Sequence, residues 1–243
     1  MQRNKILQIL ENDDEYYNGI GREFLSNSDI KILQTEPQKL KDPRGNHVNF
    51  MIGKYLHTAI LEPNKLKEFK IIEASTRNTK KYKDLSEGEI CLLQHEVDNI
   101  EYMIEKIEKN KYFTDLMSGM KVEYEIPNIM ELEGLMWKCK ADIVNHDEKL
   151  IIDLKSTSDI NKFRYSCSAY NYDSQAYIYS SMFGYEFVFM VIDKKTLKTG
   201  IFECSTEFYE AGQRKVKEAA EIYKLFYETD NFDPNQYFIT KTL

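Results

Sequence analysis

Three side chains that could carry out phosphodiester chemistry lie on two consecutive apolar segments. Asp142 lies in the first segment, and Asp153 and Lys155 follow the apolar run of the second, LIIDLK. Side chains alternate along a strand, so Asp153 and Lys155 leave the same face, and neighbouring strands lie about 4.8 Å apart. Two carboxylates placed in this way can bind one magnesium ion, together with the Leu154 carbonyl and waters. Lys155 can then orient a metal-bound water, or lower its pKa, for attack on a phosphodiester.

The same pattern also has a simpler interpretation. Asp142 and Asp153 could be strand-end residues that face solvent, with Lys155 paired to one of them. An aspartate and a lysine two residues apart occur by chance in most chains of this length. The position after an apolar run, with a second acid upstream at a strand end, favours the metal-site interpretation.

The elements that must position these residues are strands in the middle of the chain. Alternation of apolar and polar residues predicts strands over 121–126, 136–144 and 149–155. The uninterrupted apolar run at 187–192 predicts a strand covered on both faces, with a short partner at 201–204. The sequence therefore predicts an α/β (α+β) fold with a mixed central sheet flanked by helices.

Helices are predicted before, within and after this strand-rich region. Apolar residues at helical spacing predict helices over 50–61, 173–183 and 207–227. Ser28 is expected to cap a helix that Pro37 interrupts. A capping box at Ser86 and Glu89 is expected to open a further helix that ends near Lys109.

Length and composition indicate one domain with a substantial core. The chain has 243 residues, 42% of them hydrophobic. We expect a single domain over 1–243, with a mainly helical part at 1–120, a catalytic sheet core at 121–205, and a helix and tail at 206–243. No apolar run is long enough to span a membrane, and the N-terminus does not resemble a secretory signal. The four cysteines lack CxxC spacing, so we expect reduced thiols in a cytoplasmic protein.

The net charge of −7 argues against a nucleic-acid partner until its distribution is considered. Residues 64–83 hold seven basic and two acidic residues, a local charge of +5. This segment could bind DNA locally, or it could be a solvated loop. The residues that we expect to contact DNA are Arg77, Lys80, Lys81 and Lys83, with Tyr82 as a stacking residue.

Two further motifs add polar side chains to predicted helices. His57 lies on an apolar helix, where a lone histidine is more often a core or hydrogen-bonding residue than a ligand. Gln175 and Tyr179 are four residues apart and therefore share one helix face. They could contact a DNA strand or hold Lys155, or they could pack against the sheet.

Five segments in order resemble a known family: GKYLHTAILEP, RNTKKYK, GLMWKCKADIV, IIDLKSTSDINKF and YDSQAYIYS. They are similar to the PD-(D/E)xK nucleases, which share a restriction-endonuclease-like core. More narrowly, they resemble the RecE-type (exodeoxyribonuclease VIII-like) domain of phages and prophages, related to the RecB nuclease domain. The resemblance extends from about Ser26 to Tyr179.

The resemblance implies a role for each matching residue. Asp142 and Asp153 would be metal ligands, Lys155 the catalytic lysine, and His57 a residue at the metal site. Gln175 and Tyr179 match the Q-x-x-x-Y helix of the family. A glutamate on the strand before Asp142 is also expected; both Glu123 and Glu125 are candidates, and the spacing to Gly134 favours Glu123. The family often has an arginine beside the first aspartate, which this chain lacks.

The resemblance also implies a function, a cofactor and partners. We expect a Mg²⁺-dependent exodeoxyribonuclease, with Mn²⁺ as a substitute, that degrades one strand of linear duplex DNA 5′→3′ in a bacterial host cell. Relatives form rings, so a trimer or tetramer around double-stranded DNA ends is expected, with a single-strand annealing protein as partner. Relatives with an iron–sulfur cluster carry C-terminal cysteines; only Cys204 lies beyond residue 180, so no cluster is expected. The alternatives are an endonuclease or repair nuclease of the same fold, and a non-catalytic DNA-end-binding protein.

Overall fold

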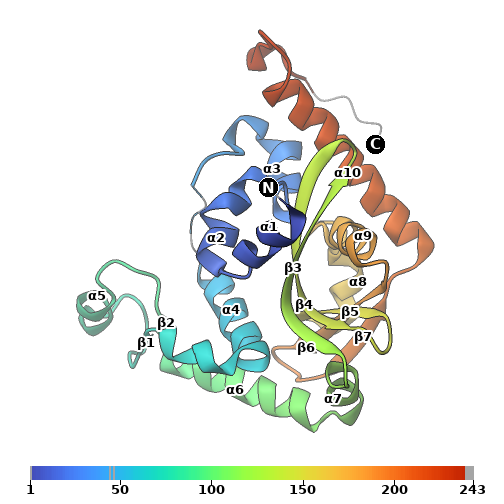
Figure 1. Ribbon diagram of the computed structural model, residues 1–243. Coiled ribbons are helices and arrows are strands. Elements are labelled where there is room, and N and C mark those ends of the chain that lie inside the picture. Colours follow the sequence, from blue (N-terminus) through green and yellow to red (C-terminus); the bar gives the residue numbers. More distant parts are fainter. Residues whose placement is uncertain (1, 44, 46, 239–243) are drawn as a thin grey trace.

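A five-stranded mixed sheet forms the centre of the computed structural model, which describes residues 2–43, 45 and 47–238. The strand order is β3-β4-β5-β6-β7 (Figure 1). β5 and β6 run parallel, and the other neighbours run antiparallel. The mixed α/β architecture expected from the sequence is thereby confirmed. The strands are β3 (Val122–Leu132), β4 (Leu135–Asn145), β5 (Leu150–Thr157), β6 (Glu186–Asp193) and β7 (Thr199–Glu203).

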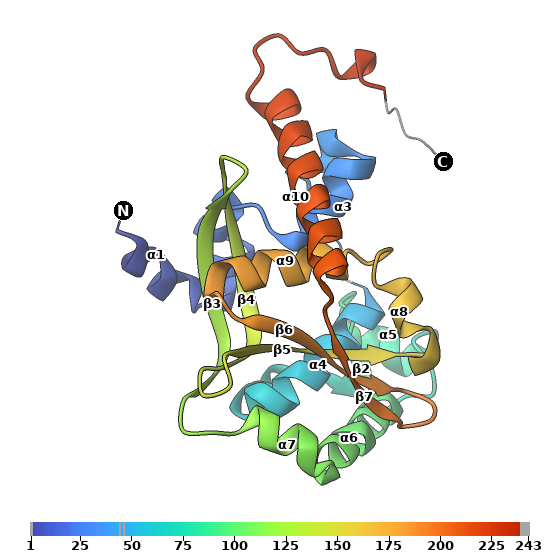
Figure 2. The same ribbon diagram turned by 90° about the vertical axis from the view of Figure 1, so that its right-hand side faces the viewer.

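Helices cover both faces of this sheet (Figure 2). One face is covered by α4 (Val48–Leu61), α6 (Gln94–Lys109) and α7 (Lys111–Met117). On the other side lie α3 (Asn27–Thr35), α9 (Tyr172–Phe183) and α10 (Thr206–Tyr227), with the short α8 (Phe163–Ser166) before α9. Across the described ranges, every helix is too short or too polar to span a bilayer.

The core follows from the alternation of side chains along β5. Ile152 and Leu154 point toward α4 and α6 and pack in one apolar cluster with Val188 and Met190 of β6. Ile151 lies in the cluster on the opposite face, with Phe187. Asp153 and Lys155 share the face of Ile151, because residues two apart on a strand point the same way. The strand thus presents its catalytic candidates toward α9.

The N-terminal part adds two features beside the sheet. α1 (Arg3–Leu10) and α2 (Asp13–Tyr17) pack near β3 and β4. Two very short parallel strands, β1 (Ile71–Ile72) and β2 (Leu92–Leu93), enclose α5 (Lys80–Ser86). Figure 1 shows that α5 projects away from the rest of the molecule. The sequence predicted neither of these strands, since two residues give no periodicity.

Two predicted helix starts are wrong. Ser86 ends α5 instead of opening a helix, because Glu87 and Gly88 turn the chain with positive φ angles of 55° and 89°. α6 begins at Gln94, where the Glu96 carboxylate accepts a hydrogen bond from the Leu93 amide at 2.9 Å. Similarly, α3 is capped by Ser26 instead of Ser28. The predicted end of α6 at Lys109 is confirmed.

Candidate active site

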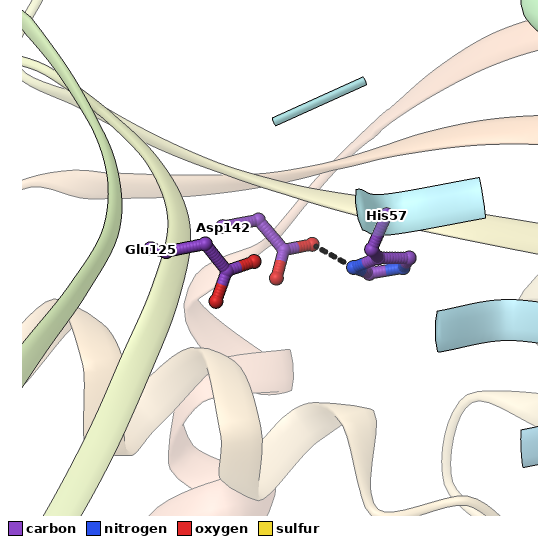
Figure 3. Close-up of side chains that lie close together, drawn as sticks. All are labelled: His57, Glu125 and Asp142. Carbon is purple, nitrogen blue, oxygen red and sulfur yellow. Dashed lines mark ion pairs between the residues drawn. The ribbon is translucent and has the colours of Figure 1, made fainter. Parts of the chain in front are cut away.

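Three side chains from separate elements converge at a candidate metal centre (Figure 3). They are His57 of α4, Glu125 of β3 and Asp142 of β4, and their ligand atoms lie within 4.8 Å of one another. His57 Nδ1 lies 3.2 Å from Asp142 Oδ2. Two carboxylates and an imidazole form a donor set that suits a divalent cation.

Asp142 lies where two paired strands separate. β4 and β5 form three residue pairs, which end at Ile143 and Ile152. Beyond that point the Leu154 amide donates to Asp142 Oδ2 at 2.8 Å instead of to a strand carbonyl. The side chain of Asp142 thus fills the gap between the strands, which fixes its carboxylate beside β5.

The β3–β4 hairpin places Glu125 across from Asp142. Its two-residue turn, Glu133 and Gly134, has positive φ at both positions (53° and 76°), as a tight hairpin requires. This turn sets a register in which Tyr124 pairs with Ile143 and Ile126 with Ala141, so that Glu125 lies opposite Asp142. Glu125 itself has a φ of 53°, which is uncommon for a residue other than glycine.

The prediction that favoured Glu123 is therefore corrected. In the same register Glu123 pairs with Val144, nearer the start of β3. Its carboxylate lies 2.7 Å from Nε2 of His146, and its side chain is 55% exposed. Counting two residues for the turn at Gly134 would have selected Glu125 from the sequence.

Asp153 and Lys155 form the second half of the site. Lys155 Nζ lies 2.5 Å from Asp153 Oδ2. The two groups form an ion pair with a hydrogen bond between them, which favours the charged form of Asp153 against the effect of burial. Oδ1 accepts a hydrogen bond from Gln175 Nε2 of α9 at 2.6 Å. Each carboxylate oxygen has two lone pairs, so the Asp153 carboxylate can bind a cation as well as these two side chains.

The site concentrates negative charge that a cation would neutralise. Burial, together with the nearby Asp142 carboxylate, raises the pKa of Glu125 to about 8. Burial also raises the pKa of Asp153. Burial opposes ionisation of Asp142 too, but His57 and Lys155 leave the pKa of Asp142 lowered. A divalent ion would stabilise all three carboxylates in their charged form, so the residues present fit the metal that the sequence predicts. The imidazole of His57 makes Mn²⁺ as suitable as Mg²⁺.

Tyr179 does not reach the metal cluster. Its hydroxyl donates to the Lys140 carbonyl at 3.1 Å, which joins α9 to β4 two residues before Asp142. Its ring packs edge-on against Phe187. Of the Q-x-x-x-Y pair, Gln175 therefore contacts the catalytic candidates, and Tyr179 positions the strand that carries one of them. The Leu154 carbonyl stays a predicted ligand.

Two residues near the site were missed by the sequence analysis. Lys140 is buried, forms an ion pair with Asp13 of α2, and lies 3.9 Å from Glu125 Oε2. Alternation along β4 puts Lys140 on the same face as Asp142, but Asp13 is too far away in the sequence for any local pattern to pair it with Lys140. Tyr172, at the start of α9, lies under Lys155, with Nζ 5.1 Å from the ring centroid.

The basic segment is partly structural. Arg77 donates to both carboxylate oxygens of Glu96, at 2.8 and 2.6 Å, and to the Cys91 carbonyl. The ring of Tyr82 is buried, and its hydroxyl accepts from the Cys91 amide at 2.8 Å. The ring of Tyr82 is therefore not exposed for base stacking as predicted, and the partly exposed Arg77 side chain is paired with Glu96. Lys80, Lys81 and Lys83 are exposed on α5.

The Tyr82→Phe variant separates a structural role from base stacking. Phenylalanine keeps a ring for stacking, but it leaves the Cys91 amide without its partner. We expect the free energy of unfolding to fall by about 1–3 kcal/mol. Denaturant titration measures this loss. Unchanged stability would mean that the hydroxyl contacts at Cys91 contribute nothing measurable to folding.

The Gln175→Ala variant tests the contact between α9 and Asp153. Residues that orient a ligand typically contribute about 10- to 100-fold to activity or metal affinity. We expect a loss of that size in the metal-dependent hydrolysis rate, with part of it recovered in Gln175→Asn at higher metal concentration. Ser180→Ala, on the same helix, is the matched control. Equal rates in wild type and Gln175→Ala would show that Asp153 needs no support from α9.

A matching family model and a solved structure of similar fold agree with this architecture. A family model described as "PDDEXK-like domain of unknown function (DUF3799)" matches residues 25–235. A crystal structure from Eubacterium rectale, named "putative exonuclease", is similar over 96% of this chain and 95% of its own, with 18% identity and a TM-score of 0.66. A phage-related exonuclease from Haemophilus somnus matches over 84% of this chain and 95% of its own, with 15% identity and a TM-score of 0.37. The comparison with curated proteins gives no match.

Proposed function

We propose that this chain, which belongs to the DUF3799 family of PDDEXK-like domains, is a metal-dependent exonuclease that acts on the ends of double-stranded DNA. One observation carries the proposal: the cluster of His57, Glu125 and Asp142 lies beside the buried Asp153–Lys155 pair. The name of the Eubacterium rectale structure, which shares the fold, also supports the exonuclease assignment.

The side chains have separable roles in this reaction. Asp142, Glu125 and His57, with Asp153, would hold a divalent cation, which when bound supplies a water of lowered pKa and polarises the phosphate. Lys155 places a positive charge beside the scissile group and offsets the charge that develops in the transition state. Gln175 and the Leu154 amide hold the two aspartates in place.

The finer features of the proposal rest on the family resemblance of the sequence. They are digestion of one strand from 5′ to 3′, a 3′ single-stranded tail for recombination, a ring of three or four subunits, and transfer of the tail to a single-strand annealing protein. The exposed lysines of α5, Lys80, Lys81 and Lys83, are suited to contact the duplex backbone, because phosphate contacts need charge and no fixed geometry. Mg²⁺ is the proposed cofactor, with Mn²⁺ as a substitute.

Digestion of matched substrates tests the proposal. Linear duplex labelled at either end should be degraded in Mg²⁺ but not in Ca²⁺, with label lost first from the 5′ end. Covalently closed circles of the same sequence should resist digestion. Circles cut as fast as linear DNA would replace the exonuclease with an endonuclease. Binding to ends without any digestion in Mg²⁺ or Mn²⁺ would indicate an end-binding protein.

A further inference from the structure

A cavity of about 880 Å³ opens beside Lys155 and plays no part in the chemistry described above. One wall is Ser156 and Thr157, which continue β5 directly after Lys155. Another is the turn between β6 and β7, at Lys194–Lys198. Tyr172 lines the cavity and also lies under the Lys155 ammonium group, so one side chain borders both the cavity and the active site. We call this space the β5 groove.

The β5 groove has a net positive charge, because its lining contains four lysines and two aspartates: Lys162, Lys194, Lys195, Lys198, Asp159 and Asp193. Lys194, Lys195 and Lys198 are exposed at its rim. Within the described residues, none of the three has a carboxylate within 4.0 Å. Asp193, the nearest acid in the sequence, is engaged by the backbone: it accepts from the amides of Ile160, Lys195 and Thr196 at 2.8–2.9 Å. These hydrogen bonds hold the lysine-bearing turn in place. The turn is thus a basic part of a chain that is acidic as a whole.

The groove also presents aromatic rings. Tyr170 is 63% exposed, and its ring centroid lies 5.7 Å from that of Tyr172, with 33° between the planes. An exposed tyrosine can stack on an unpaired base or on the terminal base of a duplex end, because the bases inside a duplex cover one another. Lysines that contact phosphates, together with tyrosines that stack on bases, are the combination by which proteins bind single strands without sequence preference.

We propose that the β5 groove binds a single strand of DNA adjacent to the scissile phosphate. Lys194, Lys195 and Lys198 contact its phosphates, and Tyr170 stacks on a base. This assignment rests on the proposed nuclease function, because it takes the bound strand to be the substrate or the product of the site at Lys155. In this proposal, the groove binds one strand of the DNA after the two strands of the duplex have separated. The α5 lysines, on a separate projection, are left to contact duplex.

Two triple variants with the same change in charge test the groove. In the groove variant, Lys194, Lys195 and Lys198 become glutamine; in the control variant, the exposed Lys5, Lys31 and Lys217 do. The affinity of the full chain for a fluorescein-labelled oligothymidylate is measured by anisotropy in Ca²⁺, at several salt concentrations. We expect the groove variant to bind about tenfold or more weakly, with a salt slope smaller by about 2, as for three lost phosphate contacts on a single strand.

Tyr170→Ala tests the stacking part by itself. Loss of one stacked base predicts about 5- to 150-fold weaker binding of the oligothymidylate, with little change for a covalently closed duplex circle. All substituted residues are exposed, so thermal unfolding midpoints should match that of wild type. Equal affinities in the groove and control variants, or an equal loss for duplex and single strand, would overturn the proposal.

A separate digestion assay in Mg²⁺ keeps this test apart from that of the nuclease. If wild type binds the oligothymidylate through the groove but never hydrolyses DNA, the groove proposal is supported and the nuclease proposal is wrong. If wild type digests DNA, and the groove variant binds and digests like the control variant, the groove proposal is wrong and the nuclease proposal is retained.

Discussion

Replacing Glu125 with glutamine is expected to lower the rate of DNA hydrolysis by about 100-fold or more, because the loss of a direct ligand should cost at least as much as the loss of a group that orients one, about 10- to 100-fold. Glutamine keeps the size of the side chain and removes its charge. The remaining donors near Asp142 then supply less negative charge, so the affinity for the cation falls. The rate should recover in part at high Mn²⁺ concentration, because Mn²⁺ accepts nitrogen ligands such as His57 more readily than Mg²⁺ does.

Glu123→Gln is the matched control, since it makes the same chemical change two residues away on the same strand. Glu123 is exposed and contacts His146, outside the metal cluster, so its variant should hydrolyse DNA at nearly the wild-type rate. The measurement is the initial rate on linear duplex as a function of Mg²⁺ and Mn²⁺ concentration. The opposite result, with Glu123→Gln inactive and Glu125→Gln active, would show that β3 shifts its register when the metal binds.

The alternation of side chains was sufficient to predict half of the site. Asp153 and Lys155 follow an uninterrupted apolar run that predicts a strand, and side chains two apart on a strand lie on one face. Asp142 could be predicted for a similar reason, as a polar residue within an apolar strand. The mixed sheet and its covering helices follow from the same patterns, because long periodic segments are determined mainly by their own residues.

The other half depends on contacts between distant segments. Glu123 and Glu125 obey the same alternation, and only the register of the hairpin distinguishes them. Asp13 and Lys140 pair across 127 positions. Tyr82 lies within a basic segment, yet its ring is buried and its hydroxyl bonds the backbone at Cys91, because the β1–α5–β2 unit folds over it. Composition indicates that a segment carries charge, but not which of its side chains are already engaged.

Replacing Lys155 with methionine is expected to lower the rate of DNA hydrolysis by roughly 10³-fold, while the protein still binds Mn²⁺. The lysine contributes no metal ligand, but its ammonium group is the cation fixed beside Asp153. Burial opposes this charge, yet Asp153 and Asp142 stabilise it, so the pKa of Lys155 is raised.

Loss of stability is the alternative explanation for an inactive Lys155→Met, and it must be measured. Removing one partner of a buried ion pair costs about 3–5 kcal/mol of folding stability. The cost is smaller where solvent reaches the pair, as it does here at the 19% exposed Lys155 side chain.

Lys155→Arg keeps the charge but cannot place a single ammonium group, so this variant should lose less stability and still cleave poorly. Lys111→Met, on the exposed start of α7, is the control for a lost lysine. Mn²⁺ binding by calorimetry and single-turnover cleavage are compared for all variants. Inactivity with intact metal binding assigns Lys155 to the chemical step, whereas activity in a folded Lys155→Met would require the charge in the transition state to be offset by the metal alone.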